Sequence, residues 1–476
     1  MSLSRRSALK LLGLGAAAGL MTVQARDEMM LHYIHPDHIV GDVHPFYHEG
    51  TWYLYYLALG FHSRLMTSTD LIHWTQIPIT HEPPNDESPE LAPYFVLGVF
   101  RDTLNGVFRT YHGWTAGNMH SHVSDNLIDW RFAPNSYRVL AQYTRYSSQR
   151  DPYVFWNEAE QQYWCVMTCK VEGYDDATSG AVGFASSPDL QRWQGRGDLY
   201  FPGTIREPEV PQVFNIGSKW YLLASIYTGI EVGKPSYWVS DAPTGPWEAP
   251  LTDSLDGQHL QAANVGFDGE CWLLFGWIPL TTPQTHGRYT WGGHLAFPRE
   301  VYQLPNGELG TRLEAAFGRA VRGELLYDSA AQPITPESGS WTLDNGFAST
   351  GDGRASLGTG YDRFDAEIDF TPSASSRVAL RIGGRYEAGV DIGRGRLFIG
   401  SISSAPLTYA DLPAALTTDP MYMRVLVEGD IVEMFVNDRY SLAARLPRKV
   451  NVGALHLITA GGEIRGGAAR VYGLLA

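Results

Sequence analysis

Cysteine is scarce in this sequence, with three residues in a chain of 476. They form no Cys-x-x-Cys pair and have no histidine at metal-ligand spacing, which excludes a zinc site and a disulfide framework. Cys165 and Cys169 fall in one expected strand, where four residues span about 13 Å, too far for a disulfide. We therefore expect all three, including Cys271, to be small buried apolar residues.

Positive charge is also scarce. The chain has 36 Lys and Arg residues against 51 Asp and Glu, a net charge of −15, and no basic cluster follows Lys10. A nucleic-acid partner is therefore not expected, because such proteins displace counterions with a cationic surface. Past the N-terminus no run of about 18 apolar residues predicts a membrane span. No glycine-rich loop follows a βαβ pattern, so we predict no cofactor, and no metal is implied.

The N-terminus has the features of an export signal. Arg5, Arg6 and Lys10 precede an apolar run over residues 11–21 and then small residues up to Ala25. This order of charged, apolar and small residues is that of a secretory signal peptide, and the paired arginines resemble a twin-arginine signal. We expect the mature protein to start near Arg26 and to be periplasmic or secreted. An uncleaved membrane anchor is the alternative.

Aromatic residues, glycine and proline are abundant. Aromatics make up 12% of the chain, with 14 Trp and 26 Tyr, beside 50 Gly and 28 Pro. Flat side chains favour strands and the many Gly and Pro residues interrupt helices, so an all-helical fold is excluded. Indole faces also suit the binding of sugars, which are uncharged.

A tryptophan-ended turn recurs four times in the first three hundred residues. Each copy runs from a Ser through an Asp to Trp74, Trp130, Trp193 or Trp247. A repeat of about 50 to 60 residues with several strands is typical of propeller blades. We predict a five-bladed β-propeller over residues 26–312. An ordinary β-sandwich with coincidental Trp turns is the alternative. The five units are expected to begin near Asp42, Leu97, Asp151, Glu209 and His259.

The C-terminal part, residues 313–476, has a different pattern. Segments such as Phe364–Phe370 and Ile431–Val436 alternate apolar and polar residues with a period of two. Short alternating strands separated by Gly, Pro and Asp turns predict a β-sandwich.

Three of the propeller units begin with a carboxylate in an apolar setting: Asp42, Asp151 and Glu209. We expect all three at the same position of their innermost strands, facing one shared channel. Glycoside hydrolysis needs two carboxyl groups beside the bond, one of them protonated, and a third can bind hydroxyls. The alternative is that these acids cap strand ends or pair with neighbouring arginines.

Five motifs in order resemble glycoside hydrolase family 32, which includes invertases, levanases and inulinases. The resemblance covers essentially the whole mature chain and implies a five-bladed propeller followed by a β-sandwich. The matching segments are residues 41–45 for an Asn-Asp-Pro-Asn-Gly motif, 150–152 for Arg-Asp-Pro, 209–211 for Glu-Cys-Pro, 291–300 for a Trp-x-Gly…Pro-Arg-Glu exit from the propeller, and 427–438 for the sandwich signature ending in Val-Glu-x-Phe-x-Asn.

The resemblance implies a retaining mechanism with three roles. Asp42 would be the nucleophile, Asp151 the transition-state stabiliser and Glu209 the acid/base. Glu207, two residues earlier in the same strand, is a rival for the acid/base because alternation places both on one face.

The sequence departs from the family around these acids, and the departures weaken any inference about the sugar. Gly41 stands before the nucleophile in place of Asn, and Val210 follows the acid/base in place of Cys. Gln212 stands where a further acid is usual. The predicted substrate contacts are Arg150, His44, Trp114, Trp277 and Trp291, the tryptophans as stacking walls.

Three functions are compatible with these residues, each with an oligo- or polysaccharide as partner. The first is an exported β-fructosidase acting on fructans or sucrose-like glycosides. The second is a furanosidase for another sugar, such as an arabinofuranoside, or a fructosyl transferase. The third is a non-catalytic sugar-binding protein, which has no need of an acid opposite a nucleophile.

Overall fold

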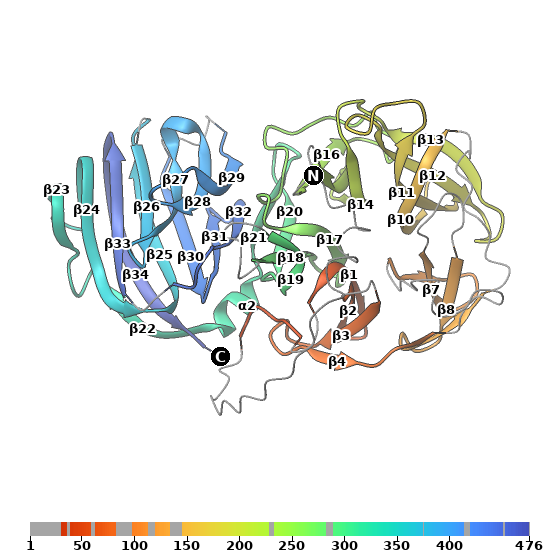
Figure 1. Cartoon of the computed structure of the whole chain (residues 1–476), viewed down its shortest axis with the longest axis horizontal. Helices are drawn as coiled ribbons and strands as arrows, with labels where there is room; N and C mark the ends of the chain where they lie inside the picture. Colours follow the sequence, from red (N-terminus) through yellow and green to blue (C-terminus); the bar gives the residue numbers. More distant parts are fainter. Residues whose placement is uncertain are drawn as a thin grey trace, which may run out of the picture.

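The computed structural model describes residues 30–35, 39–58, 62–81, 98–112, 120–133, 145–227, 233–281, 289–374, 376–413, 419–450 and 453–475. The expected signal peptide lies outside these residues. Figure 1 shows two β units side by side, a propeller from red to green and a sandwich from cyan to blue. The predicted fold class, an all-β propeller followed by a sandwich, is confirmed. No helix in the described ranges is long and apolar enough to cross a membrane.

Each propeller blade is a small antiparallel sheet whose first strand lies toward the common axis. The first strands of the five blades begin close to the five predicted unit starts. The strands are, in blade 1, β1 (Gly41–His48), β2 (Thr51–Leu57), β3 (Ser63–Ser68) and β4 (Thr75–Ile77); in blade 2, β6 (Phe100–Asp102), β7 (Val107–His112), β8 (His120–Ser124) and β9 (Asp129–Phe132), with β5 (Thr80–His81) parallel to β9; in blade 3, β10 (Tyr146–Asn157), β11 (Gln162–Val171), β12 (Gly180–Ser187) and β13 (Gln194–Tyr200); in blade 4, β14 (Glu207–Ile216), β15 (Lys219–Tyr227) and β16 (Lys234–Ser240); in blade 5, β17 (Gln261–Phe267), β18 (Trp272–Thr281), β19 (Tyr289–Leu295), β20 (Arg299–Gln303) and β21 (Leu309–Leu313).

The repeated Ser-x-Asp/Asn-Leu segment is the turn before the last strand of blades 1, 2 and 3. In blade 1 the Asp70 carboxylate accepts hydrogen bonds of 2.9 and 2.8 Å from the two amides that follow Leu71. Leu71, Leu127 and Leu190 all adopt left-handed backbone, with φ of 66°, 66° and 60°. A side-chain acceptor that caps the turn allows this otherwise unfavourable conformation, which explains why the motif recurs in these three blades.

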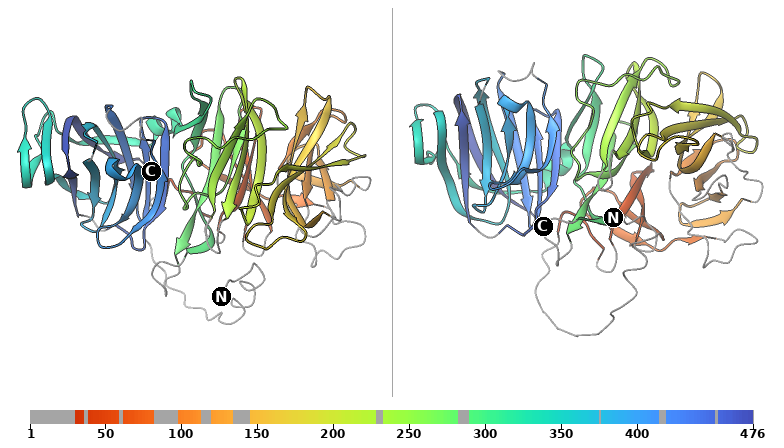
Figure 2. Two further views of the ribbon diagram at one scale, coloured as in Figure 1. Left: turned by 90° about the horizontal axis from the view of Figure 1, so that it is seen from above. Right: turned by 45° about the horizontal axis from the view of Figure 1, so that its top comes forward.

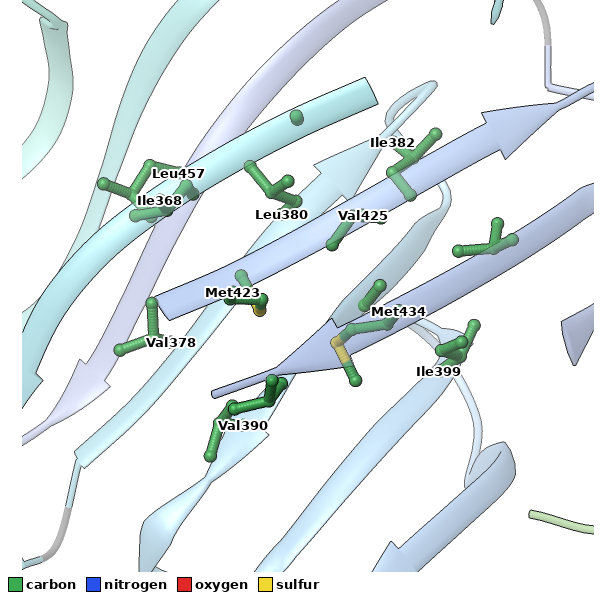
Figure 3. Close-up of a cluster of buried hydrophobic side chains, with 14 of the residues drawn as sticks. Ile368, Val378, Leu380, Ile382, Val390, Ile399, Met423, Val425, Met434 and Leu457 are labelled. Atoms are coloured by element: carbon green, nitrogen blue, oxygen red, sulfur yellow. The ribbon is translucent and has the colours of Figure 1, made fainter. Parts of the chain in front are cut away.

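The C-terminal unit is one continuous antiparallel sheet that folds over a single apolar core. Its strand order begins at β29 and ends at β32, and these two strands contact each other. Figure 3 shows Ile368, Leu380, Val425 and Met434 gathered between the strands. The elements are α2 (Ala315–Ala320), β22 (Arg322–Asp328), β23 (Thr335–Thr342), β24 (Phe347–Tyr361), β25 (Arg363–Pro372), β26 (Ser376–Ile382), β27 (Tyr386–Asp391), η1 (Ile392–Arg394), β28 (Arg396–Ser401), β29 (Pro406–Asp411), β30 (Met421–Glu428), β31 (Ile431–Val436), β32 (Tyr440–Arg445), β33 (Gly453–Gly461) and β34 (Glu463–Leu474).

A buried charged network joins the two units where the sandwich lies against blade 5 (Figure 2). The guanidinium of Arg299 lies 3.0 Å from Asp256, in the segment between blades 4 and 5, and 2.5 Å from Glu433 of the sandwich, and all three side chains are fully buried. His32, from the segment before blade 1, contacts Glu433 at 2.9 Å and Glu428 at 2.7 Å. Two of the motifs singled out in the sequence therefore meet each other: Arg299 lies in the first and Glu433 in the second.

The alternation of apolar and polar residues in β31 predicts one buried and one solvent-facing side of the strand, and the structure differs. The one polar residue of β31, Glu433, should then face solvent, yet every residue of the strand is buried. The second face of β31 packs on the propeller, so Phe435 joins an apolar cluster with Phe297 and Phe317. Glu433, on that same face, is satisfied by Arg299 and His32 instead of by water.

The cysteines follow the prediction in two cases out of three. Cys165 and Cys169 are unpaired and buried in the core of blade 3. Cys271, at the start of the β18 hairpin, is also unpaired but only half-buried, so its expected full burial is wrong.

Replacing Glu433 by Gln should destabilise the protein strongly. The substitution leaves Arg299 and His32 without a shared carboxylate in a buried place, and breaking a buried pair costs about 3 kcal/mol or more. Denaturant unfolding followed by Trp fluorescence measures the loss. The control is Glu463→Gln, which removes an exposed pair with Arg465 and should cost under about 1 kcal/mol. Equal losses in the two variants would contradict a structural role for the network.

The network should also make the stability of the folded protein depend on pH, with a loss at both the acid and the alkaline end. Burial opposes ionisation of Glu428, but bonds from His32 and the Leu31 amide hold its pKa at about 2, below the ordinary 4.5. Burial opposes protonation of His32, yet Glu428 and Glu433 raise its pKa above 6.5. Stability from Glu428 is thus present above pH 4.5 and lost toward pH 2. Stability from His32 is present below pH 6.5 and lost as the pH rises through its folded-state pKa.

Unfolding midpoints measured from pH 2.5 to 9 test this range. Glu428→Gln should lower stability at pH 6 and flatten the acid fall. An acid fall parallel to that of the wild type would contradict the assignment.

Candidate active site

The innermost strands of blades 1, 3, 4 and 5 share one irregularity near their start. Each skips two residues in its pairing with the second strand, a β-bulge. The first skipped residue has left-handed backbone in every case: Asp42 (φ 41°), Asp151 (φ 53°), Val210 (φ 48°) and Ala262 (φ 43°). Asp42 and Asp151 therefore occupy equivalent positions. Glu209 precedes the equivalent residue by one, so the expectation that all three acids share one position is wrong for Glu209.

Arg150 connects the acids of blades 3 and 4. Its Nη2 lies 2.6 Å from Glu209 Oε1 and 3.3 Å from Glu207 Oε2, and its Nε lies 3.3 Å from Asp151 Oδ2. Burial disfavours the charge of the guanidinium, but Glu209, Asp151 and Glu207 together raise the pKa of Arg150. Both glutamates reach the same cation, which confirms that they lie on one face of β14. The acids thus do pair with a neighbouring arginine, and that arginine draws them together.

Two residues of β11 complete this cluster, and the sequence analysis missed both. The Thr168 hydroxyl lies 3.1 Å from Asp151 Oδ2 and 2.9 Å from the Pro208 carbonyl oxygen, which ties blade 3 to blade 4. Lys170 Nζ lies 3.0 Å from Glu207 Oε1. The signal that could have found them is hairpin register: Arg150 is the direct partner of Thr168, and Lys170 is two residues further along the same face.

Asp42 is 5% exposed and lies at the start of β1, against the hairpin of β18 and β19. The preceding residue, Gly41, packs directly on Trp291 of β19. A Cβ at position 41 would lie 2.6 Å from Cζ2 of the indole. Paired backbone bonds between Val40 and Gly293 hold this contact in place, at 3.0 and 2.8 Å. Gly41 is therefore required by Trp291, which gives a physical reason for the missing Asn.

His44 follows Asp42 by two residues and is 5% exposed. Burial lowers the pKa of its imidazole to about 3, so the ring is neutral at physiological pH. Its Nε2 is buried without a hydrogen-bond partner among the described residues. A neutral ring with an unsatisfied nitrogen is compatible with a polar contact to a ligand, and the structure by itself assigns it none.

The predicted aromatic walls differ in their surroundings. Trp291 is half-buried, and its indole meets the indole of Trp277 edge to face, with ring centres 6.0 Å apart. Trp277 itself is 3% exposed within the cluster that includes Val43 and Leu295. The packing role is therefore the one that the structure favours for Trp277, against the predicted stacking wall. Trp114 lies outside the described residues.

Comparison with known proteins places the first three hundred residues in a recognised group. A family model described as "Glycosyl hydrolases family 32 N-terminal domain" matches residues 41–310. Invertase 1 of Saccharomyces cerevisiae is 24% identical over 273 residues, which are 51% of this chain and 47% of that protein. The match thus spans about half the length of this curated relative.

Solved structures share the whole architecture. An exo-inulinase from Aspergillus awamori superposes with a TM-score of 0.68 at 14% identity, covering 93% of this chain and 98% of the other. Fructan 1-exohydrolase IIa from Cichorium intybus gives 0.69 at 13% identity, covering 93% and 96%. A Bombyx mori β-fructofuranosidase in complex with sucrose gives 0.65 at 16% identity, covering 93% of each chain. At such identities the likeness establishes a common fold.

Gly41→Asn should destabilise the protein, because the new side chain enters the space of the Trp291 indole. Overpacking of this kind costs about 1–3 kcal/mol. In the double variant Gly41→Asn with Trp291→Ala, the total loss should be smaller than the sum of the two single losses. Denaturant unfolding measures all three variants.

Gly467→Asn is the matched control, since no atom lies within 4 Å of a Cβ at that position. Additive losses in the Gly41 and Trp291 pair would show that the two residues do not compete for one space.

Proposed function

The chain belongs to glycoside hydrolase family 32, and on this premise we propose that it hydrolyses β-fructofuranosides with retention of configuration and releases fructose. One observation carries the proposal: Arg150 binds Glu209, the proposed acid/base, beside Asp151, the proposed stabiliser, where the innermost strands of blades 3 and 4 begin. Asp42 of blade 1 occupies the position equivalent to Asp151. Carboxyl groups converging on one channel are what cleavage of a glycosidic bond requires.

The reaction proceeds in two displacements. The Asp42 carboxylate attacks the anomeric carbon while the bond to the leaving oxygen breaks, and Glu209 gives its proton to that oxygen. A water molecule then transfers a proton to the Glu209 carboxylate and bonds to the anomeric carbon. The ester bond to Asp42 breaks, which frees the nucleophile and returns Glu209 to its acid form.

The ion pairs support Glu209 over Glu207 as the proton donor. Glu207 has a cation on each oxygen, Lys170 at 3.0 Å and Arg150 at 3.3 Å. Glu207 is thus fixed by an ion pair on each of its two oxygens. Glu209 is 7% exposed and stands between Pro208 and Val210, which are both buried. Its match to the Glu-x-Pro motif points the same way.

Asp151 serves in this mechanism as an ionised acceptor for sugar hydroxyls. Arg150 at 3.3 Å and the Thr168 hydroxyl at 3.1 Å hold its carboxylate in place and favour the charged form. Hydrogen bonds from hydroxyls to a carboxylate strengthen as the ring gains positive charge, so they stabilise the transition state more than the bound substrate.

A different furanoside, or transfer to a sugar acceptor, is the second candidate. The contact between Gly41 and Trp291 favours it, because an indole replaces a polar side chain beside the nucleophile. An apolar wall removes a hydrogen bond that a fructosyl unit would otherwise meet and adds a surface on which a ring can stack.

We also propose export through a twin-arginine signal. Residues 1–25 carry Arg5 and Arg6 ahead of an apolar run and no acidic residue. The chain would then meet its saccharide outside the cytoplasm. Cell fractionation, with Arg5 and Arg6 both replaced by Lys as the control, tests this part separately.

Sugar release from sucrose, inulin, levan and aryl furanosides tests the enzyme proposal. Asp42→Asn should abolish release from every substrate, because no covalent intermediate forms. Glu209→Gln should lower release from sucrose at least about 10²-fold. Its loss should be smaller on an aryl fructoside, whose leaving group needs little proton donation. Glu160→Gln, at the far end of blade 3, is the control.

The other possible results of the sugar-release assay distinguish the substrate, the enzyme activity and the acid/base assignment. Release from arabinofuranosides alone would move the substrate and keep the mechanism. Binding without release from any sugar would overturn the enzyme proposal. If Glu207→Gln instead of Glu209→Gln shows the dependence on leaving group, the acid/base assignment is wrong.

A further inference from the structure

A single nitrogen of Arg150 is shared between two glutamates of β14. Nη2 lies 2.6 Å from Glu209 and 3.3 Å from Glu207, while Nε serves Asp151 at 3.3 Å. The Arg150 and Glu209 side chains are 11% and 10% exposed, so the contact is shielded from bulk water. Electrostatic interactions are stronger there than at an open surface. The strength with which Arg150 holds Glu209 thus depends on how strongly Glu207 attracts the same nitrogen.

Lys170 determines how strongly Glu207 attracts Arg150. Its Nζ lies 3.0 Å from the other oxygen of Glu207, and both side chains are mostly buried, at 15% and 17% exposure. Asp176 also pairs with Lys170, which keeps this ammonium in place. Because Lys170 neutralises much of the charge on Glu207, Arg150 remains nearer to Glu209 than to Glu207.

We propose that Glu207 and Lys170 are positioning residues that act through Arg150 to set the pH range in which Glu209 can carry its proton. This rests on the proposed function, in which Glu209 is the acid/base. Without Glu207, Arg150 binds Glu209 alone, a nearby negative charge is gone, and the proton on Glu209 is released at lower pH. Without Lys170, Glu207 draws Arg150 toward itself, a nearby positive charge is gone, and the proton is retained to higher pH.

Asp176 and Arg206 are further charged groups close to this cluster and are retained in every variant, although Lys170→Met removes one of the cations that pair with Asp176. Arg206 pairs with Asp176 at 2.7 Å, and this bond raises its pKa, so it stays cationic. On β11, burial raises the pKa of Cys169 to about 12, and its thiol stays neutral. Neither β12 nor β17 carries an ionisable side chain, and Lys219 lies at the far end of β15. Asp42 and Asp151 are retained throughout.

The test compares the pH dependence of kcat/KM in four forms of the full chain, with the best furanoside found for the wild type. The alkaline limb reports loss of the proton from the acid/base. Glu207→Gln should move that limb to lower pH by about one pH unit, and Lys170→Met should move it to higher pH by a similar amount. The double variant should lie close to the wild type, because one charge of each sign has been removed.

Two controls separate this effect from general damage. Lys219→Met removes an ion pair with Asp241 at the far end of the same blade and should leave the limb in place. Glu160→Gln removes an ion pair with Arg196 in blade 3 and should also leave the limb in place. Loss of stability alone would change the amplitude of the profile in all variants and would not move the two limbs in opposite directions.

An activity-free measurement keeps the inference distinct from the proposed function. The Glu209 carboxyl can be titrated by NMR in protein labelled with carbon-13 at glutamate Cδ, its signal being the one absent in Glu209→Gln. Opposite shifts in Glu207→Gln and Lys170→Met support the positioning role even if no furanoside is cleaved, which would overturn only the hydrolase. Shifts in the same direction, or none, overturn the positioning role even in an active enzyme.

Discussion

The fully buried guanidinium of Arg299 is the group on which the arrangement of the two units depends. Charge cannot be placed in a protein interior without partners, and here Asp256 and Glu433 supply them from opposite sides of the interface. His32 joins the same network through Glu428 and Glu433, so the segment leading into blade 1 is fixed to the sandwich. Such pairs add little net stability compared with apolar packing, but they penalise any displacement that separates them.

The charged interface also influences the candidate site, because the segment that contains His32 leads to the start of blade 1. Tyr33, next to His32, bonds to Leu295 of β19, and Val40 bonds to Gly293 of the same strand. Gly41 and Asp42 follow directly, against the indole of Trp291. The proposed nucleophile is thus held by the same segment that the charged interface anchors. We interpret the sandwich as a support that fixes the start of blade 1.

Backbone strain marks the same place in the innermost strands of blades 3, 4 and 5. Asp42, Asp151, Val210 and Ala262 all have left-handed backbone at a bulge, a conformation that costs side-chain-bearing residues about 1 kcal/mol or more. In each of these four strands the bulge turns the local backbone out of the regular ladder. In blade 4 the acid stands one residue before the strained position, where Arg150 of the neighbouring blade reaches it. In blades 3 and 4, binding by Arg150, not equal position in the strand, is what brings Asp151 and Glu209 together.

The sequence alone determined the all-β class, the five units and their approximate starts, because a capped turn with a left-handed leucine and a tryptophan recurs in each of the first three blades. It also singled out Asp42, Asp151, Arg150 and Glu209 from short local motifs, and the structure brings the last three into contact. What only the tertiary structure decided involves partners distant in the chain: Lys170 and Thr168 beside the acids, Trp291 filling the space at Gly41, and Glu433 buried against Arg299. Periodicity shows which face of a strand a residue occupies, whereas the nature of the surface opposite that face is set by how the blades and the sandwich pack.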